Sequence, residues 1–464
     1  MSEPAPNSIA IAFAVSAALF MHLADTYALA TVLPVLAEEF GVSPIRLKYT
    51  LTVYLFVSAI MIPASGWIAD RWGSRKVFFF SVIGFLSGSV LCALSGSVTE
   101  LVMARALQGV GGGIMVPVAR LIVVRSSDRS ELVRSLNWFT IPAILGPLIA
   151  PPIAGVLAEH ASWRWVFLIN LPIGLIGMGL VLALVPKLRH PSPGKFDFKG
   201  VALIGCAILG VMLVADTAGT GVLSGLAFLT LLFTTILLIT LAIRYARRSA
   251  KPVLDFRLFS VPSYRAALLG GGVLRLSLGA TPFLLPILLQ TGFGWSPSAV
   301  GWVFLSAASG AMLGRVFALP IIARIGFRSL LVGSAGCAAL LVMIPASYSI
   351  STPVPLIFLV AMSANIFFTI HYAASNALVF ADVPEHLTNA ASTLSVVAQQ
   401  VTQSLGISLG ALVLFLSSQS TGGEIQADSF LFPFLILGGA GLLALPVYLS
   451  LPASVAGDMR GAKR

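Results

Sequence analysis

Long apolar stretches dominate this chain, and they leave few choices of fold. A helix of about 20 residues crosses the hydrocarbon core of a bilayer. Lipid offers no hydrogen-bond partners, so a crossing segment must pair its own backbone groups, as a helix does. Windows of that length and almost free of charge lie at 9–33, 47–66, 77–96, 101–124, 136–158, 164–185, 200–217, 223–243, 265–289, 298–319, 328–347, 354–375, 391–416 and 430–450. The sequence therefore predicts an all-α membrane protein with fourteen spans.

Composition excludes a soluble protein. Of the 464 residues, 58% are hydrophobic and only 10% are charged, whereas soluble domains carry about 25% charged residues. The three cysteines all lie inside apolar runs without the spacing of a metal site, so we expect packing residues and no bound metal. The first seven residues lack the basic region of a cleavable signal peptide, so the first span is expected to act as its own insertion signal.

The distribution of Lys and Arg predicts the orientation. Outside the spans, all of these cations except Arg46, Lys48 and Arg164 fall in segments on one side of the membrane. Cytoplasmic loops carry such an excess, so both termini are expected in the cytoplasm. The net charge of +11 is then a consequence of topology, and no nucleic-acid partner is expected.

Two polar stretches, 186–199 and 244–264, flank the seventh and eighth spans. They predict a six-helix bundle over residues 1–190, a two-helix insertion over 191–262, and a second six-helix bundle over 263–464. The seventh span is the weakest of the fourteen, because Asp216 and Thr217 lie at its end. The chain contains no GxxxxGK[ST] string, so we expect neither ATP nor another cofactor.

Asp25 lies within the first span. A carboxylate at that depth costs roughly 2.5–3.5 kcal/mol on insertion scales. The nearest external charges, Glu38 and Glu39, are about 20 Å away along a helix, too far for the side chain to reach the surface. We therefore expect Asp25 to take up and release a proton. Arg105 in the fourth span needs a partner inside the membrane, and Asp25 is the natural one.

The string Gly66-Trp-Ile-Ala-Asp-Arg-Trp-Gly-Ser-Arg-Lys76 resembles motif A of the major facilitator superfamily, although Ser74 replaces a basic residue. In that superfamily the motif forms a charge latch between two six-helix halves. An ordinary positive loop would look similar, so the spacing alone does not decide. The resemblance assigns the latch to Gly66, Asp70, Arg71, Gly73 and Arg75, with Asp128 as a partner.

Further stretches agree with this resemblance. Residues 105–113 resemble motif B, and residues 142–155 resemble the antiporter motif C, carried here by Pro142, Gly146, Pro147 and Gly155. The surroundings of Asp25 and the string Trp163-Arg-Trp-Val-Phe-Leu-Ile-Asn170 look like those of the fourteen-span drug:proton antiporters of the EmrB/QacA type. Residues 376–384 and 391–400 look like the MdtD/HsrA-type subgroup. Such a chain is expected to have two six-helix bundles plus two additional helices.

The resemblance implies proton-coupled export of small amphipathic compounds by alternating access, without enzyme activity. The expected setting is a bacterial inner membrane, with protons, a small-molecule substrate and the lipid bilayer as partners, and a monomer as the working form. Two alternatives stay open. One is an exporter of a specific anionic metabolite or metal chelate, such as an organic acid or a siderophore-like compound. The other is a membrane sensor that does not transport.

Substrate contacts are expected from polar and aromatic residues of the spans. Arg275 sits in the middle of the ninth span, the counterpart of the first by the repeat, where a cation could hold an anionic group or pair with a neighbour. A single histidine or aromatic residue in a span is more often a packing residue. The candidates are Gln108, Trp138, Phe139, Arg275, Phe283, Asn365, Phe368, His371, Gln399 and Gln400.

Overall fold

The computed structural model describes residues 8–128, 131–186, 196–218, 223–249, 252–419 and 422–452. Within these ranges the chain is almost entirely helical and contains no strand. Fourteen helical segments are long and apolar enough to cross a membrane. The predicted number of spans is confirmed, including the weak seventh one, which continues to Thr217.

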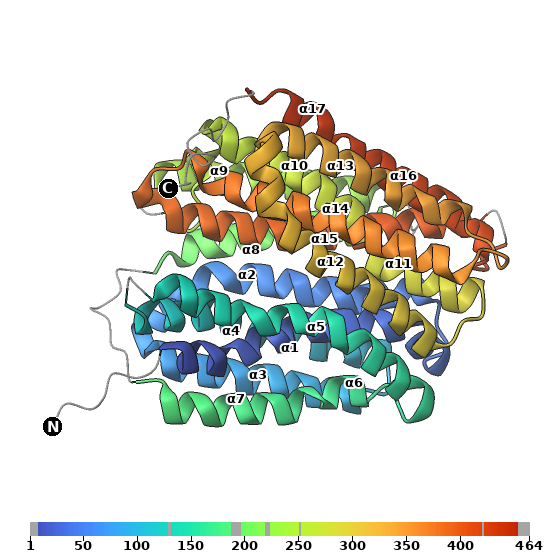
Figure 1. The fold of residues 1–464 in the computed structure, drawn as a ribbon, viewed down its shortest axis with the longest axis horizontal. Helices are drawn as coiled ribbons and strands as arrows, with labels where there is room; N and C mark the ends of the chain where they lie inside the picture. The colour runs from blue at the N-terminus through green and yellow to red at the C-terminus, as the bar shows by residue number, and fades with distance from the viewer. Residues whose placement is uncertain are drawn as a thin grey trace. The chain divides into compact units, whose positions relative to one another are not determined.

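The chain forms two compact units. The first comprises the residues up to Phe198 together with Ser296–Gly301, and the second comprises Lys199–Trp295 and the residues from Trp302 onward. The second unit thus includes the two helices that were expected as a separate insertion, and the expected boundary at residue 190 lies outside the described residues. In Figure 1 the helices of the first unit are coloured blue to green. They are α1 Ser8–Glu39, α2 Lys48–Trp72, α3 Ser74–Leu94, α4 Val98–Ser126, α5 Leu132–His160, α6 Trp165–Leu168 and α7 Asn170–Leu184.

Helix α1 lies at the centre of the first unit, where it packs against α4, α5 and α7. Glycines on two faces of α4 bring that helix close to α2 and α3. A Cβ atom on Gly113 would lie 2.7 Å from the Ser58 carbonyl oxygen, and one on Gly111 would lie 2.5 Å from the Phe85 nitrogen. Small residues allow such backbone contacts between membrane helices. These contacts hold the turn of α4 that precedes Gly111, which contains Arg105 and Gln108, in the middle of the bundle.

Within the described residues, ten helices lie wholly or mostly in the second unit, and the start of α12, up to Gly301, belongs to the first unit. Helix α10 packs against α14, α15 and α16. A π-helical turn at Leu288–Gly292 extends α11 to the end of its span. The helices are α8 Phe198–Thr217, α9 Gly225–Arg248, α10 Pro262–Gly279, α11 Thr281–Ile287, α12 Pro297–Ile325, α13 Phe327–Met343, α14 Val354–Ala381, α15 Thr388–Gln419, α16 Leu431–Leu442 and α17 Ala444–Leu449.

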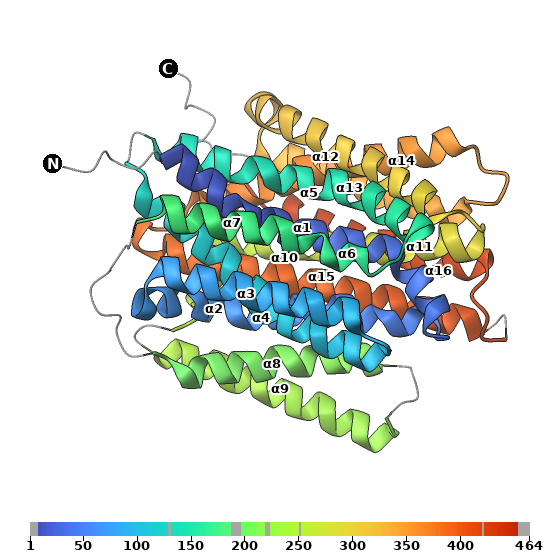
Figure 2. The same ribbon diagram turned by 90° about the horizontal axis from the view of Figure 1, so that it is seen from below.

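Helices α8 and α9 lie side by side as an antiparallel pair (Figure 2). Gly210 of α8 leaves room for Thr235 of α9, whose side-chain oxygen would lie 2.5 Å from an added Cβ atom. Asp216 does not fray the end of α8. Its carboxylate is buried and accepts a hydrogen bond of 2.6 Å from Ser408 on α15. This bond fastens the pair to the rest of the second unit.

Candidate functional site

The centre of the first unit holds a buried ion pair. Arg105 of α4 donates from Nη1 to the Oδ2 atom of Asp25 on α1, and neither side chain is exposed. The predicted partnership of these residues is confirmed, while its part in proton coupling stays a prediction. The other oxygen, Oδ1, accepts from Gln108 at 2.8 Å and from Asn170 at 3.2 Å. Arg105 also donates from Nε to the carbonyl of Thr50 at 2.9 Å.

Gln108 belongs to this network and offers no surface to a substrate. It is completely buried, its Oε1 accepts from Arg105 at 2.6 Å, and its Nε2 also donates to Ser89 at 2.9 Å. We expected a substrate contact here, but in this structure both ends of the amide are used within the bundle. A buried amide with all its bonds made serves to orient its neighbours.

Tyr54 and His22 extend the network, and neither was among the residues expected from the sequence. The guanidinium carbon of Arg105 lies 4.2 Å from the centre of the Tyr54 ring, a distance typical of a cation–π contact. The Tyr54 hydroxyl lies 2.5 Å from Nδ1 of His22. His22 is only half-buried and precedes Asp25 by three positions, so both side chains lie on the same face of α1.

The string at residues 163–170 contacts α1 at two levels. Trp163 donates from its indole to Glu39 at 2.5 Å, and Arg164 pairs with the same carboxylate at 2.8 Å. Seven residues after Trp163, the side chain of Asn170 reaches Asp25. The string therefore anchors the end of α1 while it supplies a donor to the buried carboxylate.

The antiporter motif lies on α5, which carries Pro142 and Pro147 within the helix. Gly146 faces α1 beside the ion pair. A Cβ atom there would lie 3.1 Å from the Ala24 nitrogen, directly before Asp25 in the chain. Gly155, two turns later, leaves room for Ser298, whose Cα would lie 2.9 Å from an added Cβ atom. The glycines allow α5 to pass close to its neighbours.

The motif between α2 and α3 makes different contacts from those expected. Asp70 pairs with Arg125 of α4 at 2.6 Å, whereas Asp128 is exposed and forms no ion pair among the described residues. Arg75 donates to the carbonyl of Leu182 on α7. The charge contact of Asp70 thus involves Arg125, one residue before α4 ends at Ser126.

The two glycines of this motif have separate roles. Gly73 has a φ of +89° and separates α2 from α3, a backbone conformation that residues with a Cβ atom rarely adopt. Around Gly66, an added Cβ atom would meet nothing within 4 Å. In this structure Gly66 is therefore not a point of close helix contact. Arg71 is exposed beside them.

A second polar cluster surrounds Arg275 in the second unit. Its guanidinium lies 5.0 Å from the centre of the Tyr372 ring, and its Nε atom has no hydrogen-bond partner among the described residues. Tyr372 donates to Gln399 at 2.9 Å. Beside them, His371 is buried and lies 3.1 Å from the Tyr448 hydroxyl. No carboxylate in the described part of the chain pairs with Arg275.

The remaining substrate candidates divide by exposure. Phe139 and Phe283 are buried core residues, so in this structure they pack rather than line a binding surface. Trp138 is 40% exposed. Asn365 is half-buried and donates to the carbonyl of Ala361 at 3.0 Å, while Phe368 and Gln400 are also half-buried. In the ranges that the structure describes, no group of three His, Cys, Asp or Glu side chains gathers as a metal site.

Comparisons with known proteins agree with this architecture. The peptide transporter POT in complex with sulfate aligns with a TM-score of 0.71 at 16% identity, over 98% of this chain and 96% of that chain. A mutant of the nucleoside transporter NupG aligns with a TM-score of 0.67 at 12% identity, over 95% of this chain and 99% of that chain. At these identities the likeness shows the fold alone.

Relatives found by sequence comparison share a higher identity with this chain than these solved structures do. The "Putative multidrug resistance protein MdtD" of Escherichia coli O157:H7 (strain EC4115 / EHEC) is 33% identical over 435 residues, which covers 93% of this chain and 91% of MdtD. The protein of the same name from Shigella boydii serotype 4 (strain Sb227) matches equally well. The sequence profile of the Major Facilitator Superfamily matches residues 15–406. The chain therefore belongs to the Major Facilitator Superfamily.

Proposed function

We propose that this chain is a proton-coupled exporter of small amphipathic compounds. One observation carries the proposal: a carboxylate, Asp25, lies without exposure inside a transporter bundle, held by one cation and two amides. Ionisable groups at this depth are costly and mark ion pathways in membrane proteins. The multidrug name of its relatives supports drug-like substrates.

Protonation of Asp25 is expected to change the packing of the helices around it. When Asp25 takes up a proton, its attraction to Arg105 falls, while Arg105 keeps its bonds to Thr50 and Gln108. A buried ion pair that loses one charge is destabilised by about 3–5 kcal/mol. Protonation therefore favours a different packing of α1 against α4, and that packing change is the coupling step. His22, half-buried and linked to Tyr54, is the group through which the proton reaches the pair.

The available energy suffices for useful export. A membrane potential of 100 mV supplies about 2.3 kcal/mol per charge, and each pH unit adds about 1.4 kcal/mol. One proton moving inward per compound moving outward sustains a gradient of roughly a few hundred-fold. The excess of cations on one face supports an orientation with both termini in the cytoplasm of a bacterial cell, and the two bundles of a single chain support a monomer as the working form.

Proteoliposomes test this function directly. Purified protein is reconstituted with a pH-sensitive dye inside, and a panel of amphipathic compounds is added under an imposed pH gradient. Transport of a substrate in one direction should move protons across the membrane in the opposite direction. Asp25→Asn should abolish this exchange. The matched control is Asp216→Asn, which changes a second carboxylate buried in a span of the described residues and should retain the exchange. Exchange at wild-type rate in Asp25→Asn would refute the proposal.

A second candidate function rests on Arg275. This guanidinium lies at substrate depth without a carboxylate partner among the described residues, beside the Tyr372 ring and the Gln399 amide. Arg275 is half-buried, and its Nε atom is buried without a hydrogen-bond partner among the described residues. An anionic substrate would supply both a partner and a compensating charge. Export of an organic acid or a metal chelate is the function that this cluster supports.

A further inference from the structure

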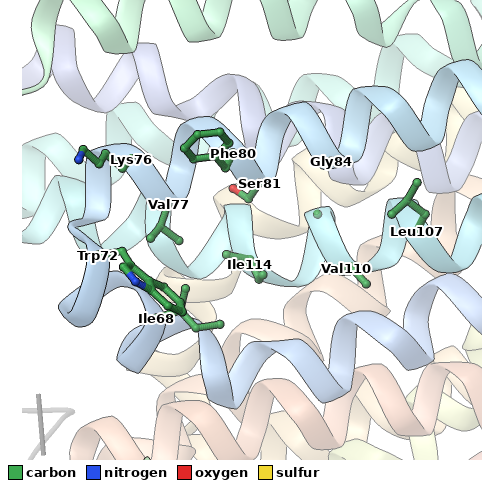
Figure 3. Close-up of a pocket in the computed structure, with 11 residues that line it drawn as sticks. Ile68, Trp72, Lys76, Val77, Phe80, Ser81, Gly84, Leu107, Val110 and Ile114 are labelled. Atoms are coloured by element: carbon green, nitrogen blue, oxygen red, sulfur yellow. The ribbon is translucent and has the colours of Figure 1, made fainter.

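The outer face of the first unit carries a hollow of about 410 Å³ between the end of α2, the first half of α3 and the middle of α4 (Figure 3). Trp72 and Lys76 lie at one end and Leu107 at the other. From Lys76 to Gly84 the groove follows α3 for about 12 Å. Its lining residues extend from the end of α2 along α3 to the middle of α4.

Glycines explain why the groove is hollow. A Cβ atom on Gly84 would meet only the Cα atom of Gly111, at 3.9 Å, and Gly111 itself lies against the backbone of Phe85. Where α3 and α4 cross, neither helix contributes a side chain, so the floor is backbone. Other side chains then stand as walls around this floor.

The walls are apolar and open outward. Phe80 is 67% exposed, Trp72 58% and Leu107 40%. Of the lining residues, only Lys76, Ser81 and Trp72, through its indole nitrogen, have polar side-chain atoms. Apolar groups exposed on membrane-spanning helices face hydrocarbon, and a Trp at a span end is typical of the membrane interface.

A cation, Lys76, lies at one end of the groove. Lys76 is the third residue of α3 and is exposed. Among the described residues, no carboxylate pairs with Lys76 or with Arg71 nearby. Asp70, the nearest acid in the chain, already pairs with Arg125, and Arg75 bonds to a carbonyl. The groove therefore combines an apolar channel with uncompensated positive charge at headgroup depth.

We propose that this groove binds one anionic phospholipid, with an acyl chain along α3 and α4 and the phosphate on Lys76. Charge complementarity selects this occupant, because cations at the membrane surface attract anionic lipid by about 1 kcal/mol each. The site goes beyond the transport function proposed above. With both termini in the cytoplasm, as proposed there, the bound lipid belongs to the cytoplasmic leaflet. It adds a lipid requirement to the segment Gly66–Lys76.

Tryptophan quenching tests the site. Wild-type protein is titrated in mixed micelles with phosphatidylglycerol whose acyl chains carry bromine, and the same is done with brominated phosphatidylcholine. Subtracting the signal of Trp72→Phe isolates the groove tryptophan. Quenching of Trp72 should saturate, and half-saturation by phosphatidylglycerol should need about fivefold less lipid than by phosphatidylcholine. Lys76→Gln should remove this difference, whereas Arg247→Gln, which removes an exposed cation at the end of α9, should leave it.

A second variant tests the apolar part. Gly84→Leu places a side chain on the floor and should abolish saturable quenching, whereas Gly179→Leu on α7, where an added Cβ atom also has open space, should not. Equal half-saturation for both lipids with no effect of Lys76→Gln would mean ordinary annular lipid and would overturn the proposal. A groove closed by a second copy, seen as a doubled protein mass without lipid binding, would overturn it as well. None of these readouts requires transport, so they stay separate from the test of export.

Discussion

Asp25 and Arg105 stand eighty positions apart in the chain and form an ion pair in which neither side chain is exposed. Each comes from a different helix, and donors from α4 and α7 complete the shell around the carboxylate. Because no water can replace a lost partner there, a change in the charge of either residue must be met by a change in packing. The pair is therefore suited to convert a proton into movement of helices.

The first prediction separates a coupling role from a merely structural one. Asp25→Asn leaves the Arg105 charge unpaired and should destabilise the fold by about 3–5 kcal/mol. The double variant Asp25→Asn/Arg105→Gln removes both charges and should recover most of that loss in a thermal unfolding assay. Proton-driven export should stay absent from both variants. If export returned with stability in the double variant, the pair would be structural only.

A second prediction concerns the Tyr54 ring. Tyr54→Phe loses the hydroxyl contact with His22 but keeps a ring beside Arg105, so it should cost about 1 kcal/mol. Tyr54→Leu also loses the cation–π contact and should cost about 2 kcal/mol more. The free energy of unfolding in detergent measures both. Equal losses would show that the face of the ring contributes nothing to holding the cation.

The third prediction addresses the segment Gly66–Lys76. Asp70→Asn breaks the pair with Arg125, which is only partly buried, so turnover should fall about twofold to fivefold. Substrate affinity, measured by equilibrium binding, should stay unchanged because the pair lies at the end of the helices. Asp128→Asn is the control and should be neutral, since Asp128 is exposed. A loss of affinity with normal turnover would contradict the latch.

Close packing of α5 against α1 leads to the fourth prediction. Gly146→Val places a branched side chain where even a Cβ atom lies 3.1 Å from the Ala24 nitrogen. The resulting shift of α1 should displace Asp25 and reduce the rate of proton-driven export at least tenfold. A tenfold loss corresponds to about 1.4 kcal/mol. Gly179→Val on α7 has open space and should be silent. Normal export in Gly146→Val would show that α1 tolerates a shift at this point.

The spans and the central pair were predictable because their causes are local or forced. Long apolar runs must be helices in lipid, and two opposite charges in one bundle must find each other. The rest of the site was not predictable in the same way. The Thr50 carbonyl is a backbone acceptor without a sequence signal, and the pairing of Asp70 with Arg125 depends on where α4 ends. His22 could have been noticed, since it lies one turn before Asp25.

The roles of the glycines in helix packing were also not predictable from the sequence. Gly66 and Gly73 belong to the same motif, yet Gly73 is required by its positive φ, whereas Gly66 has open space around it in this structure. Which glycine makes a close contact depends on how each helix is rotated about its axis. That rotation is decided by the sum of all packing contacts, and no single motif reports it.

The last prediction decides between the two classes of substrate. Arg275→Gln removes a half-buried cation that no described carboxylate neutralises, while the amide can still bond to the polar groups around Tyr372. If substrates are anions, the apparent KM for an anionic compound should rise at least tenfold, as expected for a lost charge-assisted bond of about 1.5–3 kcal/mol, and export of a cationic dye should be spared. If substrates are lipophilic cations, the change should be neutral or favourable, because it removes a like charge. Gln400→Ala, in the same unit, is a control for loss of polarity without loss of charge. Parallel loss of folded protein and of transport for both compounds would contradict either substrate role and leave Arg275 as a residue that stabilises α10 against α14.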